Sequence, residues 1–269
     1  MSHPATPAAA RRAIEWFHSF NGPLGYLTLQ PPKGDAVRVN VGEPLPPGDF
    51  EIRKLWFDHW KSADDAKFKI PAITAADFRT HAATLKNLRT CFLRDLDLRS
   101  DDLAFLSQNP DLGYLTVENC RGGGDSLIPR IAGLKNLYYL NLDNSEASGD
   151  PLTGQNLGTL ACLPNLVAAY FMYSSLGDAG VATLVERCPK IQNMGFAKTR
   201  ITDAALRTLS RRALNELRLD SNPALTDAGL AELAKIPSLN SLFLYGSTNL
   251  TDAGIAAFQQ AHPECKIAK

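Results

Sequence analysis

Cysteine and histidine are the residue types in this chain most able to do chemistry, either as metal ligands or as a nucleophile with its base. The chain holds five of each: Cys91, Cys120, Cys162, Cys188 and Cys265, and His3, His18, His59, His81 and His262. They form no CxxC pair and no histidine cluster at the spacing of a zinc site. The sequence therefore predicts no metal site and no cofactor.

Covalent catalysis requires a nucleophile, a base and an orienting group in one place. His59 beside Asp58 is the one pair worth inspecting, and Cys91 and Cys265 occupy apolar positions where their thiols should be buried. The glycine-rich stretch RGGGD at 121–125 lacks the lysine and the spacing of a phosphate-binding loop, so it predicts a connecting loop. We expect a protein that is not an enzyme, although a site assembled by folding stays open.

Charge and hydropathy exclude several classes of partner. The 28 basic and 28 acidic residues cancel, so no net field draws the chain to nucleic acid or to an anionic membrane. No apolar run reaches the roughly 18 residues of a membrane span, and none of signal-peptide length follows the first residues. The five cysteines are an odd number and widely spaced, which fits reduced thiols better than a disulfide framework. These features predict a cytoplasmic protein that binds neither nucleic acid nor a membrane.

The elements that would position any site follow from an internal repeat. The apolar pattern LxxLxL recurs seven times, and its first members are Leu88, Leu112, Leu137, Leu166, Ile191, Leu214 and Leu239. These residues are separated by steps of 24, 25, 29, 25, 23 and 25. A period of this length is typical of a solenoid in which each repeat packs on its neighbours.

A second signature follows the strand triplets and predicts a helix in each repeat. It reads LGDAGV at 176–181, ITDAAL at 201–206, LTDAGL at 225–230 and LTDAGI at 250–255. The Thr or Asp that opens each segment is a natural N-cap, and an acidic residue there also suits the helix dipole. Leu93, Leu96 and Leu98 offer a competing LxxLxL register, which we reject because alignment places Leu98 at the start of a helical half.

These LxxLxL and LTDAGL motifs resemble those of the leucine-rich-repeat family, especially the bacterial type with LTDAGL repeats, which is similar to ribonuclease-inhibitor-like and F-box-associated arrays. The resemblance covers roughly residues 50–267. It implies an α/β solenoid with a curved parallel sheet inside and helices outside. The motif predicts the fold and says little about function.

The two ends of the chain predict caps for the solenoid. Residues 1–49 contain an amphipathic helix and two alternating strands, LGYLTLQ and AVRVNV, and are expected to form a mixed α/β N-terminal cap. Residues 50–269 are expected to form the array of about eight strands with its C-terminal cap at HPECKI. Its first strand contains Ile52, Leu55 and Phe57, and DHWKSADDAKFK is an insertion after it.

Side chains alternate along a strand, so the residues between the leucines should project from the concave sheet. Aromatic and arginine side chains there are typical of interface hot spots. We predict that a protein partner binds this face, with Tyr114, Tyr139, Tyr170 and Met172 at the centre. The predicted binding residues are Trp56, Phe92, Arg94, Tyr114, Glu118, Tyr139, Asp143, Tyr170, Met172, Arg218, Phe243 and Tyr245.

Three alternatives stay open. The aromatic residues can simply suit strands and shield the sheet. The chain can be a structural or oligomerising unit, which an uncovered apolar edge at Cys265 and Ile267 would support. It can also be an enzyme or an enzyme accessory with a pocket between cap and array, which a deep polar cavity near His59 and Trp56 would support. The sequence leaves the identity of the partner and the oligomeric state open.

Overall fold

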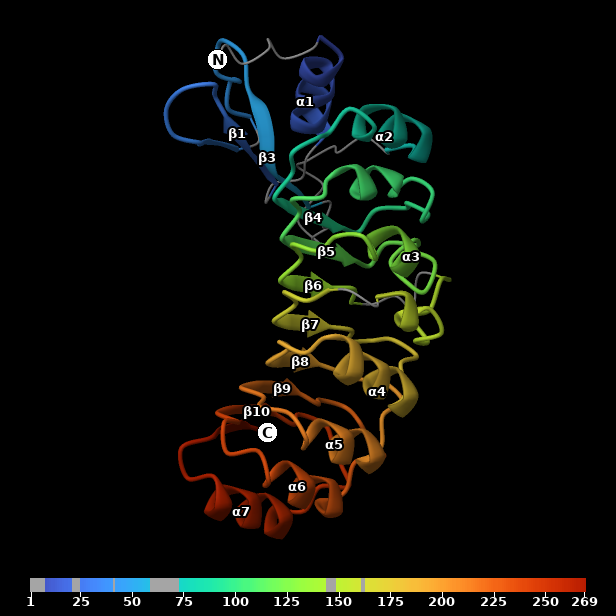
Figure 1. Cartoon of the computed structure of the whole chain (residues 1–269), viewed down its shortest axis with the longest axis vertical. Helices are drawn as coiled ribbons and strands as arrows, with labels where there is room; N and C mark the ends of the chain where they lie inside the picture. The colour runs from blue at the N-terminus through green and yellow to red at the C-terminus, as the bar shows by residue number, and fades with distance from the viewer. Residues whose placement is uncertain (1–7, 21–24, 41, 59–72, 144–148, 161–162) are drawn as a thin grey trace.

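Strands and helices alternate along an elongated molecule (Figure 1). The computed structural model describes residues 8–20, 25–40, 42–58, 73–143, 149–160 and 163–269. The predicted insertion at 58–69, with His59, lies almost wholly outside these residues, as does Cys162. The strands are β1 (Tyr26–Gln30), β2 (Val37–Asn40), β3 (Glu51–Asp58), β4 (Thr90–Arg94), β5 (Tyr114–Glu118), β6 (Tyr139–Asn141), β7 (Ala168–Tyr170), β8 (Asn193–Gly195), β9 (Glu216–Arg218), β10 (Ser241–Phe243) and β11 (Lys266–Ala268).

These strands form one 11-stranded sheet in the order β11-β10-β9-β8-β7-β6-β5-β4-β3-β1-β2. From β3 to β11 every neighbouring pair is parallel, whereas β1 is antiparallel to both β2 and β3. The sheet lines the inner side of a gentle bend, and the helices cover the other side (Figure 1). This architecture is a leucine-rich-repeat solenoid, as the repeat predicts.

The helical side has two forms. The α-helices are α1 (Ala8–Phe20), α2 (Ala75–Ala82), α3 (Ile128–Ile131), α4 (Asp178–Arg187), α5 (Asp203–Leu209), α6 (Asp227–Leu233) and α7 (Asp252–Ala261), and two repeats carry 3₁₀ helices η2 (Ala104–Gln108) and η4 (Leu157–Leu160). The regular helices α4 to α7 begin at the DAG and DAA segments. Of the elements without this signature, α2 begins at its own N-cap, Thr74, whereas α3, η2 and η4 are short, and within the described residues neither α3 nor η2 has a side-chain cap.

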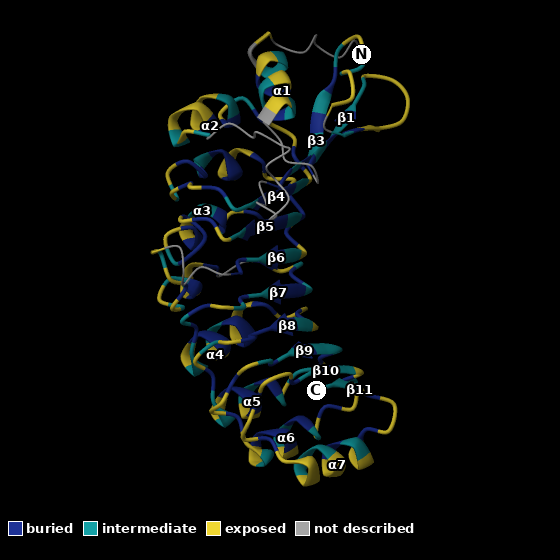
Figure 2. Ribbon diagram, turned by 180° about the vertical axis from the view of Figure 1, so that it is seen from behind, coloured by how far each residue is buried: buried dark blue, intermediate teal, exposed yellow. Residues whose placement is uncertain are grey.

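The leucines of the triplets fill the interior between sheet and helices, where burial runs along the length of the molecule (Figure 2). Leu115, Leu140 and Leu217 are all fully buried. The register chosen for the first regular repeat is confirmed, because β4 spans Thr90–Arg94 and buries Cys91 and Leu93. One continuous hydrophobic core therefore supports the whole concave face.

Helix starts are linked from one repeat to the next. Thr202, Thr226 and Thr251 are N-caps whose hydroxyls accept a hydrogen bond from a first-turn N–H. The aspartate at the first helical position of one repeat then accepts hydrogen bonds from the N–H and the hydroxyl of the N-cap threonine in the following repeat. The pairs are Asp178–Thr202, Asp203–Thr226 and Asp227–Thr251.

The first elements continue the same core. Phe17 of α1 contacts Phe57 and Phe78 edge-on, at ring-centroid distances of 5.5 Å in both cases. Trp16 stacks on His81 of α2 at 4.6 Å. The core therefore runs on from α1 into the array without a break, and the division at residue 49 stays a prediction.

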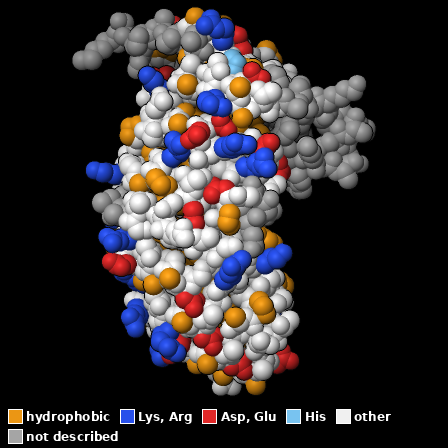
Figure 3. Space-filling model, turned by 90° about the vertical axis from the view of Figure 1, so that its right-hand side faces the viewer, with side chains coloured by type: hydrophobic (Ala, Val, Ile, Leu, Met, Phe, Trp, Pro, Cys, Tyr) orange, Lys and Arg blue, Asp and Glu red, His pale blue; other side chains and the backbone are white. Residues whose placement is uncertain are grey.

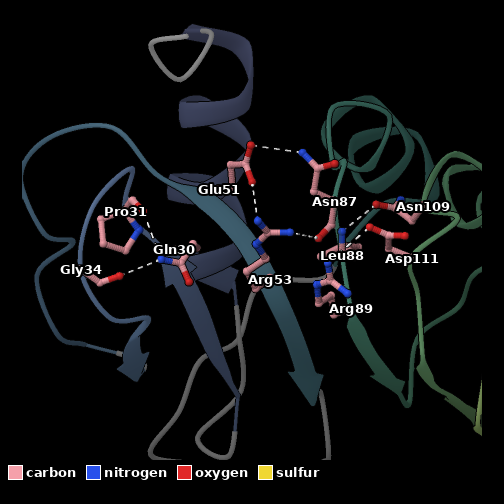
Figure 4. Close-up of polar contacts among 10 residues, drawn as sticks. All are labelled: Gln30, Pro31, Gly34, Glu51, Arg53, Asn87, Leu88, Arg89, Asn109 and Asp111. Carbon is pink, nitrogen blue, oxygen red and sulfur yellow. Dashed lines mark hydrogen bonds and ion pairs between the residues drawn. The ribbon is translucent and has the colours of Figure 1, made fainter. Parts of the chain in front are cut away.

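Polar side chains join β3 to the start of the next repeat (Figure 4). The Glu51 carboxylate pairs with Arg53 at 3.2 Å and accepts a hydrogen bond from the Asn87 side chain, also at 3.2 Å. The buried Asn109 side chain accepts from the Leu88 N–H at 2.9 Å. The Asn109 side-chain amide thus satisfies the backbone N–H of Leu88.

Candidate functional site

The sheet register places the predicted binding residues in rows across the concave face. One row runs through Trp56, Phe92, Thr116, Asn141, Tyr170, Gly195, Arg218 and Phe243, each paired with the next. A second row begins Asp58, Arg94 and Glu118, and a third contains Tyr114 beside Tyr139. The alternation predicted these positions, while a role in binding stays a prediction.

Aromatic rings stack across the first strands of the sheet, and we call Tyr26, Trp56 and Phe92 the N-terminal stack. Tyr26 lies 5.4 Å from Trp56 with ring planes 13° apart, and Trp56 lies 3.9 Å from Phe92 with planes 3° apart. The Arg38 guanidinium sits 3.8 Å over Tyr26, and that of Arg94 sits 5.4 Å over Phe92. Phe92 is only 6% exposed, so this stack mainly packs the sheet surface.

A second group of rings, Tyr114, Tyr139 and Tyr170, follows on β5 to β7, and we call it the tyrosine cluster. Tyr114 and Tyr139 stack at 4.2 Å with planes 6° apart, and Tyr170 lies 5.6 Å from Tyr139. All three are partly exposed. Burial raises the pKa of Tyr170 to about 12 and also raises that of Tyr139, so both hydroxyls stay neutral donors at physiological pH.

The aromatic surface continues toward the C-terminal repeats through Arg218. The Tyr170 hydroxyl donates to Glu216 at 3.1 Å, and Arg218 Nε donates to the same carboxylate at 2.8 Å. The Arg218 guanidinium lies 5.6 Å from the Tyr170 ring and 4.7 Å from the Phe243 ring. Tyr245 follows β10 and is 55% exposed. The predicted residues from Trp56 to Tyr245 therefore form an extended surface.

Arg94 organises the acidic residues at the N-terminal side of this surface. Its Nε donates to Asp58 Oδ1 at 3.0 Å, and its Nη2 contacts Oδ2 of the same carboxylate. Glu118 lies farther away, with 3.9 Å between Arg94 Nη1 and Oε1. Because Asp58 is almost fully buried, this two-point pair compensates a charge that would otherwise be costly inside the sheet surface.

Asp143 is the second buried carboxylate on this face. Its Oδ1 accepts a hydrogen bond from the Met172 N–H at 2.8 Å. Its pKa is raised to about 7, mainly by burial and to a smaller extent by the nearby charge of Glu118. Burial also raises the pKa of Glu118. The centre of the concave face therefore holds two acidic groups whose ionised forms are disfavoured.

On β5, Thr116 lies between Tyr114 of the tyrosine cluster and the acidic Glu118. Its side chain is fully buried, and its hydroxyl oxygen has no hydrogen-bond partner among the residues that the structure describes. Sequence reasoning assigned it no role, since threonine is common in strands. It also missed Tyr26 and Arg38, although the alternation of LGYLTLQ could have placed Tyr26 on the same face as Trp56.

A cleft of about 390 Å³ lies on the helical side, between α2 and the loops after β4 and β5. Ion pairs line it, with Arg79 2.9 Å from Asp102 and Arg121 3.4 Å from Asp97. Trp56 does not line it, and His59 lies outside the described residues. Figure 3 shows basic, acidic and apolar side chains interspersed over one side of the molecule, without one dominant charge.

The cysteine thiols are the other groups that the sequence offers for chemistry. Cys91, Cys120, Cys188 and Cys265 are buried free thiols, and burial raises the pKa of each. The described residues contain no group of three or more His, Cys, Asp or Glu side chains arranged to hold a metal ion. Within the same residues, no helix has the length and apolar character needed to span a membrane.

Comparison with known proteins supports the fold. No protein-family model matches the chain, and no curated protein matches it. Among solved structures, a chain from the crystal structure of the Rad7 and Elc1 complex in yeast superposes with a TM-score of 0.52 at 16% sequence identity. The match covers 72% of this chain and 64% of that chain, less than two thirds of its length. This likeness shows a shared leucine-rich-repeat-like solenoid fold.

Proposed function

We propose that this chain is a non-enzymatic protein-interaction module whose partner lies on the concave sheet face. The observation that carries the proposal is the tyrosine cluster, which places three partly exposed rings on the side of the sheet away from the leucine core. Aromatic side chains contribute much of the binding free energy at protein interfaces. The structural neighbour comes from a protein–protein complex, which agrees with an interaction role.

The other readings have weaker support. Trp56 and Phe92 cover each other, so the idea that aromatics only shield the sheet suits the N-terminal stack better than the tyrosine cluster. Cys265 is buried and Ile267 packs partly against the core, so the last strand offers only a small apolar edge for oligomerisation. The cleft beside α2 is not lined by Trp56, so it gives no support to a pocket there.

Two finer assignments belong to the same proposal. The segments LTDAGL at 225–230 and LTDAGI at 250–255 support placing the repeats in the bacterial type of the leucine-rich-repeat family. Balanced charge and scattered cysteines support a cytoplasmic location. Neither assignment changes the position of the binding face.

Affinity capture from a lysate of the source organism tests the proposal. Wild type is compared with a Tyr139→Ala, Tyr170→Ala variant, and Tyr138→Ala is the matched control because Tyr138 is 51% exposed and lies next to Tyr139 without belonging to the cluster. Circular dichroism checks each fold. A partner held by wild type and control but lost by the double variant supports the concave face. A partner held by all three contradicts it.

A further inference from the structure

The centre of the concave face carries acidic side chains and no basic one of its own. On β5, β6, β7 and the positions just after them, the residues that face this side are Tyr114, Thr116, Glu118, Tyr139, Asn141, Asp143, Ala168, Tyr170 and Met172. The nearest cations come from β4 and β9. Arg94 binds Asp58 at two points, and Arg218 binds Glu216. Arg94 is therefore shared between Asp58 and Glu118, and among the described residues no basic side chain forms an ion pair with Asp143.

Asp143 keeps unused hydrogen-bonding capacity. It is 8% exposed, and Oδ1 accepts from the Met172 N–H at 2.8 Å. The Asn141 side chain is its other hydrogen-bonding neighbour. A carboxylate can accept about four hydrogen bonds, and a buried one is costly unless a cation or donors compensate it. Asp143 is thus suited to accept further donors that carry positive charge.

Thr116 independently indicates that a donor is missing at this place. Its neighbours on the same face of β5 are Tyr114 on one side and Glu118 on the other, so it lies at the floor between rings and carboxylates. Its buried hydroxyl oxygen has no partner among the described residues. A buried hydroxyl normally forms at least one hydrogen bond. An N–H group inserted between the tyrosine cluster and the carboxylates could supply it.

The tyrosine cluster supplies the third part of such a site. Stacked rings present faces and edges that attract a cation within about 6 Å of a ring centroid, and the attraction grows when the site is shielded from water. Carboxylates beside those rings add direct charge pairing. A negatively charged side chain would instead meet Glu118 and Asp143 and be repelled.

From this arrangement we infer that Glu118, Asp143, Thr116 and the tyrosine cluster form a site on the concave face that binds a basic side chain, arginine or lysine, of the partner protein. The inference rests on the proposed function, since it names what the concave face recognises. The basic group pairs with Glu118 and Asp143, donates a hydrogen bond to the Thr116 hydroxyl, and lies against the tyrosine rings. The stem of the basic side chain is covered by the same rings.

Selection from a phage-displayed library of random peptides tests the inference with the full chain immobilised at pH 8, above the pKa of Asp143. Four proteins are compared: wild type, Glu118→Gln with Asp143→Asn, Tyr139→Ala with Tyr170→Ala, and a control with Glu186→Gln and Glu264→Gln. The control removes the same charge from exposed sites on α4 and the loop before β11. Affinities of the best peptide and of its Arg→citrulline or Lys→Gln form are then measured.

We expect wild type and control to enrich peptides that share an arginine or lysine. Replacing that residue, or using the Glu118→Gln, Asp143→Asn protein, should weaken binding about tenfold or more, which corresponds to one charged hydrogen-bonded pair. Peptides that depend on Tyr139 and Tyr170 but lack a basic residue, or bind the neutralised protein equally well, overturn this inference and leave the proposed function standing. If no selected peptide depends on the two tyrosines, both proposals fail.

Discussion

The Asp203 carboxylate accepts two hydrogen bonds from Thr226 in the following repeat: one from the backbone N–H to Oδ1 at 2.9 Å, and one from the hydroxyl to Oδ2 at 2.6 Å. Thr226 Oγ1 in turn accepts from the Ala228 N–H at 3.3 Å. One threonine therefore caps its own helix and ties that helix to the previous repeat. Such contacts between neighbours supply the coupling on which a solenoid depends.

Replacing Asp203 with alanine should lower the free energy of unfolding by about 1–2 kcal/mol, because two hydrogen bonds and a favourable charge at a helix start are lost. Urea unfolding, monitored by circular dichroism, measures this loss of free energy. Asp252→Ala is the matched control, since Asp252 has the same position in the last helix but pairs with Lys269 and is almost fully exposed. Equal losses in the two variants would contradict the role of the inter-repeat link.

The repeat period predicted the strands, because a leucine triplet every 23 to 29 residues must face one core. It could not predict the link between Asp203 and Thr226. Spacing within one repeat identifies both Asp and Thr as possible N-caps. Whether the aspartate side chain reaches the threonine of the next repeat depends on how the two repeats stack. Nor did the pattern predict that η2 and η4 are short 3₁₀ helices, since their segments lack the capped DAG start.

Alternation along strands predicted which residues lie on the concave face, but it could not predict which of them cover each other. Phe92 is largely hidden under Trp56, and Tyr26 extends the stack through an antiparallel pairing that has no repeat signature. The unpartnered hydroxyl of Thr116 is likewise a result of packing between strands. Residue type alone does not reveal it.

Replacing Arg94 with alanine should cost about 3–5 kcal/mol of unfolding free energy, because the buried Asp58 carboxylate would lose both of its contacts with the guanidinium. A double variant, Asp58→Asn with Arg94→Met, should recover much of that loss, since neither buried charge remains. Chemical denaturation of both variants provides the comparison. Arg121→Ala is the control, because its pair with Asp97 is exposed and should contribute at most about 1 kcal/mol. A loss in the double variant as large as in Arg94→Ala would refute this account.

The buried thiols should resist alkylation while the chain is folded. Burial raises the pKa of Cys120 to about 12 and of Cys188 to about 11, so little thiolate exists at pH 8 and the sulfur atoms are shielded. Iodoacetamide treatment followed by peptide mass spectrometry should find Cys91, Cys120 and Cys188 unlabelled in the native protein and labelled in urea. Rapid native labelling of Cys120 would show that its repeat opens readily.

The acidic centre of the concave face should make stability depend on pH. Asp143 has a folded-state pKa of about 7 against an ordinary value of 3.8, mainly because of burial. Glu118 adds repulsion, Arg218 and the Met172 N–H oppose the shift, and the neighbouring tyrosines stay neutral. Between pH 3.8 and about pH 7, the folded state binds more protons at Asp143 than the unfolded state does, so the free energy of unfolding falls as pH rises.

Asp143→Asn removes this titration, so the variant should match wild type near pH 4 and exceed it by on the order of 4 kcal/mol above pH 7, which is the energy equivalent of the shift. The asparagine oxygen can still accept the Met172 N–H, so the fold keeps that contact. Urea unfolding of both proteins at pH 4.5, 6 and 8 follows the difference. Because the gain comes from removing a disfavoured ionised carboxylate, the difference must grow with pH. A difference that stays constant across this range would mean that Asp143 ionises normally in the folded protein.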